Sequence, residues 1–183
     1  MRKFAMMFAA ALAAVLFTGC GENKTPEPSA AASLPGKALG RADRTYSLNN
    51  LKQIGLGIEM FRTGNNDRFP ASLDELSSCI DPSVLIAKFD RTTARGGSSY
   101  AYIGGGIGNV RSGLADIPVA FEKPSLLPKG QNDVAVLYAD GHTAVVPCPN
   151  VAGKTCRQTA EILAAKVSDA GVKAKLLRNA DAY

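Results

Sequence analysis

The chain has 183 residues, of which 46% are hydrophobic and 20% are charged, and its formal net charge is +5. This composition is typical of a folded globular chain and excludes an intrinsically disordered one, and the length allows one domain with a sizeable core. The positive excess is too small to indicate nucleic-acid binding, so we expect no nucleic acid as a partner.

The first twenty residues read as an export signal. Arg2 and Lys3 precede an apolar run over residues 4–17, which is shorter than the roughly 20 apolar residues that span a bilayer. The run ends in Thr18-Gly19-Cys20, which resembles the lipobox of bacterial lipoproteins. The resemblance implies that residues 1–19 are a signal peptide that is removed and that Cys20 becomes the lipidated N-terminus, which anchors the chain in a membrane. An ordinary cleaved signal with a coincidental cysteine is the alternative.

Export limits the functions that the chain can have. An envelope protein has no supply of ATP or NAD, so we expect no cofactor. Gly21 follows Cys20 where inner-membrane retention would favour Asp, so the sequence favours the outer membrane over the inner membrane.

Residues 20–40 are rich in Pro, Ser, Ala and Gly and have no structural period, which predicts a flexible tether. About twenty such residues have a mean span of about 25 Å. The sequence thus predicts a globular domain over residues 41–183, held close to a membrane surface.

A long helix is predicted over residues 41–62. Leu51, Ile54 and Ile58 recur on one face at a period of 3.6 residues, with Leu48 and Phe61 extending the row. Gly55 and Gly57 weaken a helix by about 1 kcal/mol each relative to Ala, which indicates close packing of another backbone. Gly64 is predicted as the left-handed residue that ends the helix.

Two short helical turns should follow. Ser72 and Glu75 have the spacing of a capping box, which predicts a helix over residues 73–79. Asp81-Pro82 predicts a second turn, since Pro is favoured at the first helical position.

Four short strands are expected, over residues 99–103, 117–122, 134–139 and 142–146. Asp140-Gly141 joins the last two, and this dipeptide between apolar runs is typical of a two-residue type I′ hairpin. That turn would place Tyr138 opposite Thr143. Both faces of the hairpin are apolar, so we expect the long helix to cover one face and residues 157–182, with a break near Gly171, to cover the other.

Four cysteines are present, at positions 20, 79, 148 and 156. Cys148 and Cys156 lie eight residues apart across a turn-rich loop, so an oxidising compartment favours a disulfide between them, worth about 2–3 kcal/mol. Cys79 is then an unpaired thiol. One histidine and no CxxC pair argue against zinc, and we expect no bound metal.

Four segments in this order resemble the prepilin-type globular domain of type II secretion pseudopilins. They are the helical pattern over residues 49–56, the Phe69-Pro70 motif, the Tyr100-x-Tyr102 strand, and the Asp-Gly-His pattern over residues 136–143. The resemblance covers residues 45–147 and implies an α+β fold with a long N-terminal helix packed on a small antiparallel sheet. The prepilin cleavage site and membrane helix are absent from the sequence, which indicates a pseudopilin-like head on a lipoprotein anchor.

Other candidate sites have plainer explanations. His142, beside Asp140 and Gly141 of the hairpin turn, fits a metal ligand or a pH-sensitive contact, or a side chain that packs locally. The glycines over residues 104–108 lack the Lys-Ser/Thr and the βαβ context of a phosphate loop. Calcium could be held by loop oxygens at Asp116, Asn132 and Asp133 or over residues 65–67, although turn chemistry explains both groups. The cations of the C-terminal helices fit anionic head groups or a solvated face.

These observations lead to one expectation and one alternative. We expect a non-enzymatic, lipid-anchored envelope protein with protein partners in secretion or pilus-type machinery. The alternative is an envelope module that binds a small ligand or a polysaccharide. A hydrolase is disfavoured, because no nucleophile and base are paired in the sequence.

Overall fold

The computed structural model describes residues 39–93 and 97–183. The helices α1 (Arg41–Gly64), α2 (Cys156–Leu163) and α3 (Ala170–Ala180) flank one sheet of four strands, which gives the predicted α+β fold. The strands are β1 (Tyr100–Tyr102), β2 (Pro118–Glu122), β3 (Asp133–Tyr138) and β4 (Thr143–Pro147). They form an antiparallel meander in the order β1-β2-β3-β4. The predicted tether (20–40) and leader lie almost wholly outside the described residues.

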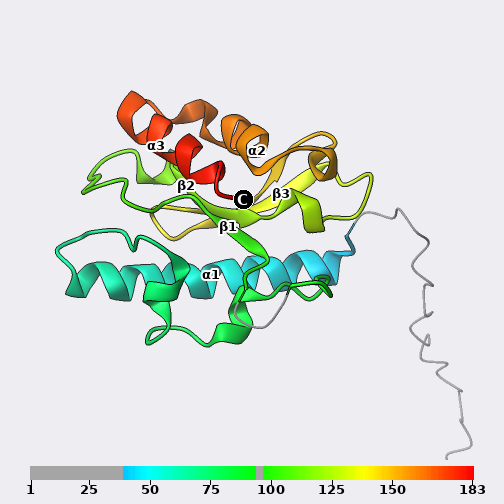
Figure 1. The fold of residues 1–183 in the computed structure, drawn as a ribbon, viewed down its shortest axis with the longest axis horizontal. Helices are drawn as coiled ribbons and strands as arrows, with labels where there is room; N and C mark the ends of the chain where they lie inside the picture. Colours follow the sequence, from blue (N-terminus) through cyan, green and yellow to red (C-terminus); the bar gives the residue numbers. More distant parts are fainter. Residues whose placement is uncertain (1–38, 94–96) are drawn as a thin grey trace, which may run out of the picture. The chain divides into compact units, whose positions relative to one another are not determined.

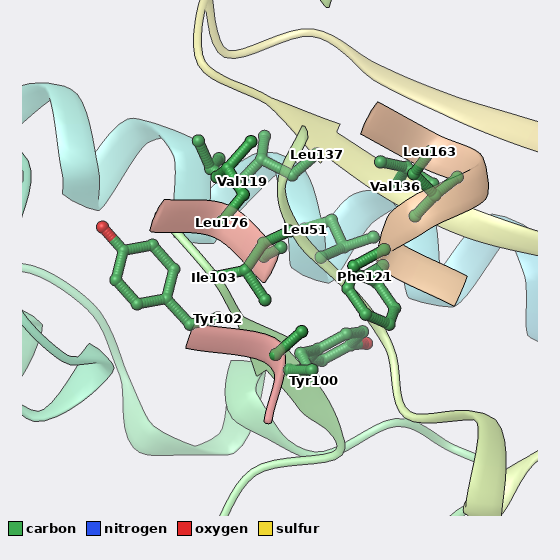
Figure 2. Packing of buried hydrophobic residues seen from close by; sticks show 14 of the residues in the cluster. Leu51, Tyr100, Tyr102, Ile103, Val119, Phe121, Val136, Leu137, Leu163 and Leu176 are labelled. Atoms are coloured by element: carbon green, nitrogen blue, oxygen red, sulfur yellow. The ribbon is translucent and has the colours of Figure 1, made fainter. Parts of the chain in front are cut away.

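The two groups of helices cover opposite faces of the sheet (Figure 1). Helix α1 packs on β2, β3 and β4 from one side, while α3 contacts β1 from the other. Strands β2 and β3 are therefore buried on both faces. Strand β4, the second strand of the predicted hairpin, is half-buried or exposed along its length, so the expected cover of both hairpin faces holds for β3 and not for β4. Figure 2 shows side chains from α1, the sheet and the C-terminal helices in one hydrophobic cluster.

Helix α1 packs as its sequence pattern predicted. Leu51, Ile54 and Ile58 are buried, and both internal glycines lie at close contacts. A Cβ atom on Gly55 would come within 2.9 Å of Leu137, and one on Gly57 within 2.5 Å of Ile80. These glycines are therefore required by packing against the sheet and the turn after residue 76.

The end of α1 differs from the prediction. Gly64 belongs to the helix, and the left-handed residues are Asn66 and Asp67, with φ of 54° and 59°. The backbone N–H of Asp67 donates to the carbonyl of Arg62 at 3.0 Å. Asn and Asp tolerate the left-handed conformation better than other non-glycine residues, so they replace the predicted glycine cap.

The connecting helices are shorter than expected. The turn after Ser72 is a 3₁₀ helix over Leu73–Leu76, and Glu75 accepts from the backbone N–H of Ala71 rather than that of Ser72. Helix α3 begins at Ala170, so the break near Gly171 falls at residues 167–169. Asp169 caps α3 by accepting from the N–H of Val172 at 2.9 Å, and this side chain, rather than a glycine, sets the start.

Candidate functional site

The hairpin between β3 and β4 is present, but its turn is not the predicted type I′. Leu137 pairs with Thr143 and Val136 with Ala144, so the register is shifted by one residue from the expected one. The N–H of Gly141 donates to the carbonyl of Tyr138 at 2.9 Å, and only Gly141 has a positive φ, of 82°. This is a three-residue loop in which a type I turn is followed by a left-handed glycine.

The turn holds the only histidine of the chain in a fixed position. The imidazole of His142 stacks on Tyr138 with ring centroids 4.3 Å apart and planes 3° from parallel. Its Nδ1 lies 2.6 Å from Oδ1 of Asp140, which also accepts from the His142 backbone N–H at 3.0 Å. Although partial burial acts to raise the pKa of Asp140, these contacts from His142 lower it overall. His142 therefore packs and hydrogen-bonds locally.

A groove runs beside the turn along β4. It has a volume of about 320 Å³ and is lined by side chains of the hairpin, of the segment before β2 (Ala115 and Asp116) and of α2 with the turn that follows it. Val145 and Ile162 on its wall are each 40% exposed. Strand β4 is an edge strand, so its outward backbone groups at Thr143 and Val145 have no partner strand among the described residues. An exposed edge strand beside a groove is typical of surfaces that bind an extended peptide as an additional strand.

A second concave region lies at the start of α2. It has a volume of about 460 Å³ and is lined by polar and charged side chains that include Lys154, Arg157, Asp181 and Tyr183. Arg157 pairs with Glu161 and with Asp181, so its charge is already neutralised. The size of this region suits a small polar ligand. None of the buried side-chain atoms without a hydrogen-bond partner among the described residues belongs to its lining.

The outer face of α1 exposes large apolar side chains. Leu56 and Met60, one turn apart, are 57% and 60% exposed, and Tyr46 lies on the same helix at 42%. Exposed apolar groups that are grouped in this way are typical of protein contact surfaces. The hydrophobic stripe that buries α1 does not include them, so the sequence pattern alone assigned them no role.

The four segments that resemble pseudopilins contact one another around α1. Lys52 donates from Nζ to the carbonyl of Gly141 at 2.9 Å, which joins the helix to the hairpin turn. The Tyr102 hydroxyl donates to the carbonyl of Pro70 at 3.0 Å, which joins the strand to the Phe-Pro motif. Phe69 in turn lies under the guanidinium of Arg62. The motifs therefore form one contiguous packing unit.

A buried charge network that the sequence analysis missed fixes the start of α1. Arg44 donates to the carboxylates of Glu122 and Asp133, and Glu122 is completely buried. Glu122 also accepts from the N–H of Ala135 at 2.8 Å. Arg44 and Glu122 are 78 residues apart in the sequence, so no local pattern predicts their ion pair. The one signal in the sequence is an acidic residue, Glu122, at the end of an otherwise apolar strand.

The same network reaches the point where the chain enters the domain. The N–H of Leu39 donates to Oε1 of Gln131 at 2.8 Å, and Nε2 of Gln131 donates to Asp133 at 2.5 Å. Three buried oxygens in the same region have no hydrogen-bond partner among the described protein atoms. They are Oγ of Ser47, the hydroxyl of Tyr100 and Oε1 of Glu122. Burial raises the pKa of Tyr100, so its hydroxyl stays protonated.

The cysteines of the described residues are unbridged in the structure. Cys148 follows β4 and Cys156 begins α2, and both are buried. Burial raises the pKa of each thiol, with Lys123 opposing the effect at Cys156. The disulfide between them stays a prediction. Cys79 is half-buried beside Ser78.

The oxygens that we considered for calcium do not converge. Asp133 is bound to Arg44, and Asn132 accepts from the N–H of Asn150 at 2.9 Å. Over residues 39–93 and 97–183, no three His, Cys, Asp or Glu side chains are grouped in a way that could hold a metal ion. Within the same residues, no helix has both the length and the apolar character that a membrane span requires.

Cys20, the predicted lipidation site, lies outside the described residues. Comparisons with protein-family models, with curated proteins and with solved structures each return no match.

Proposed function

We propose that this chain is a non-enzymatic, lipid-anchored protein of the cell envelope, with a pseudopilin-like head that contacts secretion or pilus-type machinery. The observation that carries the proposal is the leader that ends in Thr18-Gly19-Cys20, followed by a polar stretch up to Leu39. Leader, tether and domain follow one another in the order that a lipid-anchored envelope protein requires. We place the chain in the outer rather than the inner membrane because Gly21 follows Cys20.

The packing of the head supports the pseudopilin-like part of the proposal. The segments on which the resemblance rests contact one another through Lys52, Gly141, Tyr102 and Pro70. These two hydrogen bonds join the helical pattern to the hairpin turn and the Tyr-x-Tyr strand to the Phe-Pro motif. The exposed Leu56 and Met60 beside this unit supply an apolar surface for a partner.

The environment of His142 supports a non-enzymatic role. A histidine that activates a side-chain nucleophile needs that nucleophile within hydrogen-bond distance and a group that orients the ring. Asp140 and Tyr138 orient the ring, but its hydrogen bonds within the described residues involve only Asp140. The site therefore has an orienting pair without a nucleophile.

A binding module for a small ligand or a polysaccharide is the second candidate. It is favoured by the concave regions of about 460 and 320 Å³, which fall in the size range of ligand pockets. Native mass spectrometry of the purified protein separates the two candidates. A bound sugar or small molecule would favour the module, and its absence from a chain that cross-links to proteins would favour the first proposal.

Site-specific photo-cross-linking in intact cells tests the partner. We expect a photoreactive residue at Leu56 or Val145 to cross-link to pilus-type or secretion components, because both side chains are exposed and apolar. The same residue at Arg111, an exposed polar position in the loop before β2, is the control. Equal cross-linking at all three positions, or none, would contradict the proposed contact surface.

A further inference from the structure

Positive charge is concentrated in the last part of the chain. The described residues before position 151 hold ten Lys and Arg against eleven Asp and Glu. Residues 151–183 hold six against three, which are Lys154, Arg157, Lys166, Lys173, Lys175 and Arg178 against Glu161, Asp169 and Asp181. The basic character of the domain therefore resides in its C-terminal helical segment.

Helix α3 carries three of these six cations, at positions that are half-buried or exposed. Val172, Leu176 and Ala180 face the core, and α3 itself contains no acidic residue. We define its basic face as Lys173, Lys175 and Arg178. Arg178 is exposed and points away from the core, while Lys173 and Lys175 are half-buried on the two flanks of the helix, and Lys175 lies over Gly106.

The carboxylates closest to this face in sequence are already engaged. Asp169 accepts from the N–H of Val172, and Asp181 pairs with Arg157 at 2.7 Å. The ion pairs of the described residues involve Arg44, Arg62, Arg68, Arg157 and His142, and none includes a cation of the basic face. Among residues 39–93 and 97–183, the basic face is therefore not neutralised by an ion pair.

We propose that the basic face of α3 rests on an anionic phospholipid surface and orients the head on the membrane that carries it. The inference deepens the proposed function, since it depends on the lipid anchor to keep the domain close to a bilayer. A folded domain of about 145 residues has a radius of gyration near 15 Å. The proposed tether over residues 20–40, whose composition predicts a mean span of about 25 Å, would let any face of such a domain reach the surface, so charge would decide which face stays there.

The size of the expected effect follows from the number of cations. Each Lys or Arg near an anionic bilayer strengthens attachment about fivefold at moderate salt. Three cations together give about a hundredfold, which falls as salt screens them. This attachment is weak for a free protein but sufficient for a domain that a short tether confines near the surface. Helix α3 lies on the opposite side of the sheet from α1 (Figure 1). The exposed side chains of α1, Leu56 and Met60, therefore stay open to protein partners.

Vesicle co-sedimentation tests the proposal without the acyl chains. The mature chain carrying Cys20→Ser is mixed with vesicles of phosphatidylglycerol and phosphatidylcholine, or of phosphatidylcholine alone, at 50 and 300 mM salt. The test variant is Lys173→Gln/Lys175→Gln/Arg178→Gln. The matched control is Lys88→Gln/Arg91→Gln/Lys129→Gln, which removes the same charge from exposed positions elsewhere. Circular dichroism checks that both variants fold.

We expect binding to the anionic vesicles at low salt only, a loss of about a hundredfold in the test variant, and binding of the control within about threefold of the parent. An equal loss in the control, binding to neutral vesicles, or no binding by the parent would overturn the proposal. A parent chain that binds dextran sulfate but not anionic vesicles would overturn it in favour of an anionic polysaccharide. Because Cys20 is replaced in every sample, failure here leaves the lipid anchor to be judged separately.

Discussion

At the residue scale, the side-chain interaction whose loss we expect to destabilise the domain most is the ion pair between Arg44 and Glu122. Removal of Arg44 would leave a fully buried carboxylate without its cation, and such losses cost about 3–5 kcal/mol. We expect Arg44→Ala to lower the free energy of unfolding by that amount in urea denaturation.

Two comparisons separate this effect from a general loss of charge. Arg68→Ala breaks a more exposed pair with Glu75, 3.7 Å apart, and should cost less than about 1 kcal/mol. Arg44→Met/Glu122→Met removes both charges and should recover most of the loss. Similar losses for Arg44→Ala and Arg68→Ala would show that the buried network contributes little.

The thiols provide a second prediction at this scale. Cys148 and Cys156 are both buried, so in the folded protein they would resist alkylation whether bridged or free. The labelling must therefore be done in denaturant. Without reductant, we expect the peptides that contain Cys148 and Cys156 to stay unlabelled while the Cys79 peptide reacts. Labelling of all three would show that no bridge forms.

At the element scale, the β3–β4 turn depends on one glycine. Gly141 is left-handed, and an L-residue there costs about 1–2 kcal/mol. We expect Gly141→Ala to cost this amount in thermal or urea unfolding. Asp140 has no positive φ, so Asp140→Ser, which keeps an acceptor for the N–H of His142, should cost less than about 0.5 kcal/mol. Equal losses at both positions would instead support a type I′ turn.

The loop before β1 carries a predicted acid sensitivity. Burial acts to raise the pKa of Asp90, but hydrogen bonds from Ser99, Thr93 and Thr92 lower it well below its ordinary value. A carboxylate with a depressed folded-state pKa stabilises the fold above its unfolded pKa of about 4 and loses this effect as pH falls toward the folded value. We expect the melting temperature to fall from pH 5 to pH 2.

Asp90→Asn identifies the source of that change. The variant should have a lower melting temperature at pH 7 and a shallower decrease below pH 4, because the amide does not titrate. Ser99 also donates to Asp90 at 2.6 Å while accepting from the N–H of Ala87, so Ser99→Ala should act in the same direction. A pH profile of Asp90→Asn parallel to that of the parent would exclude this loop as the origin.

These elements show where sequence reasoning holds. The stripe of Leu51, Ile54 and Ile58 predicts α1 because periodicity is a local property. The hairpin is predicted by Asp140-Gly141, but its register is wrong by one residue. The choice between two-residue and three-residue loops depends on whether Asp140 turns left-handed. Contacts between α1 and Gly141, which lie far apart in sequence, accompany the three-residue form.

At the scale of the whole molecule, the candidate site was less predictable than the fold. The sequence singles out His142, and local packing is one of the two interpretations that its position beside the turn allows. The exposed pair Leu56 and Met60 and the Arg44 network could not be derived, because exposure and long-range pairing depend on which helix face meets the sheet. The excess of positive charge in residues 151–183 is predictable from the sequence, because it depends on composition alone.

The proposed function depends most directly on how the head is attached to the envelope. Mass spectrometry of the N-terminal peptide, from protein isolated from its native envelope, measures this directly. We predict a chain that begins at Cys20 and carries diacylglycerol on its sulfur, with residues 1–19 removed. A chain that still begins at Met1, or a cleaved N-terminus without acyl chains, would contradict the account.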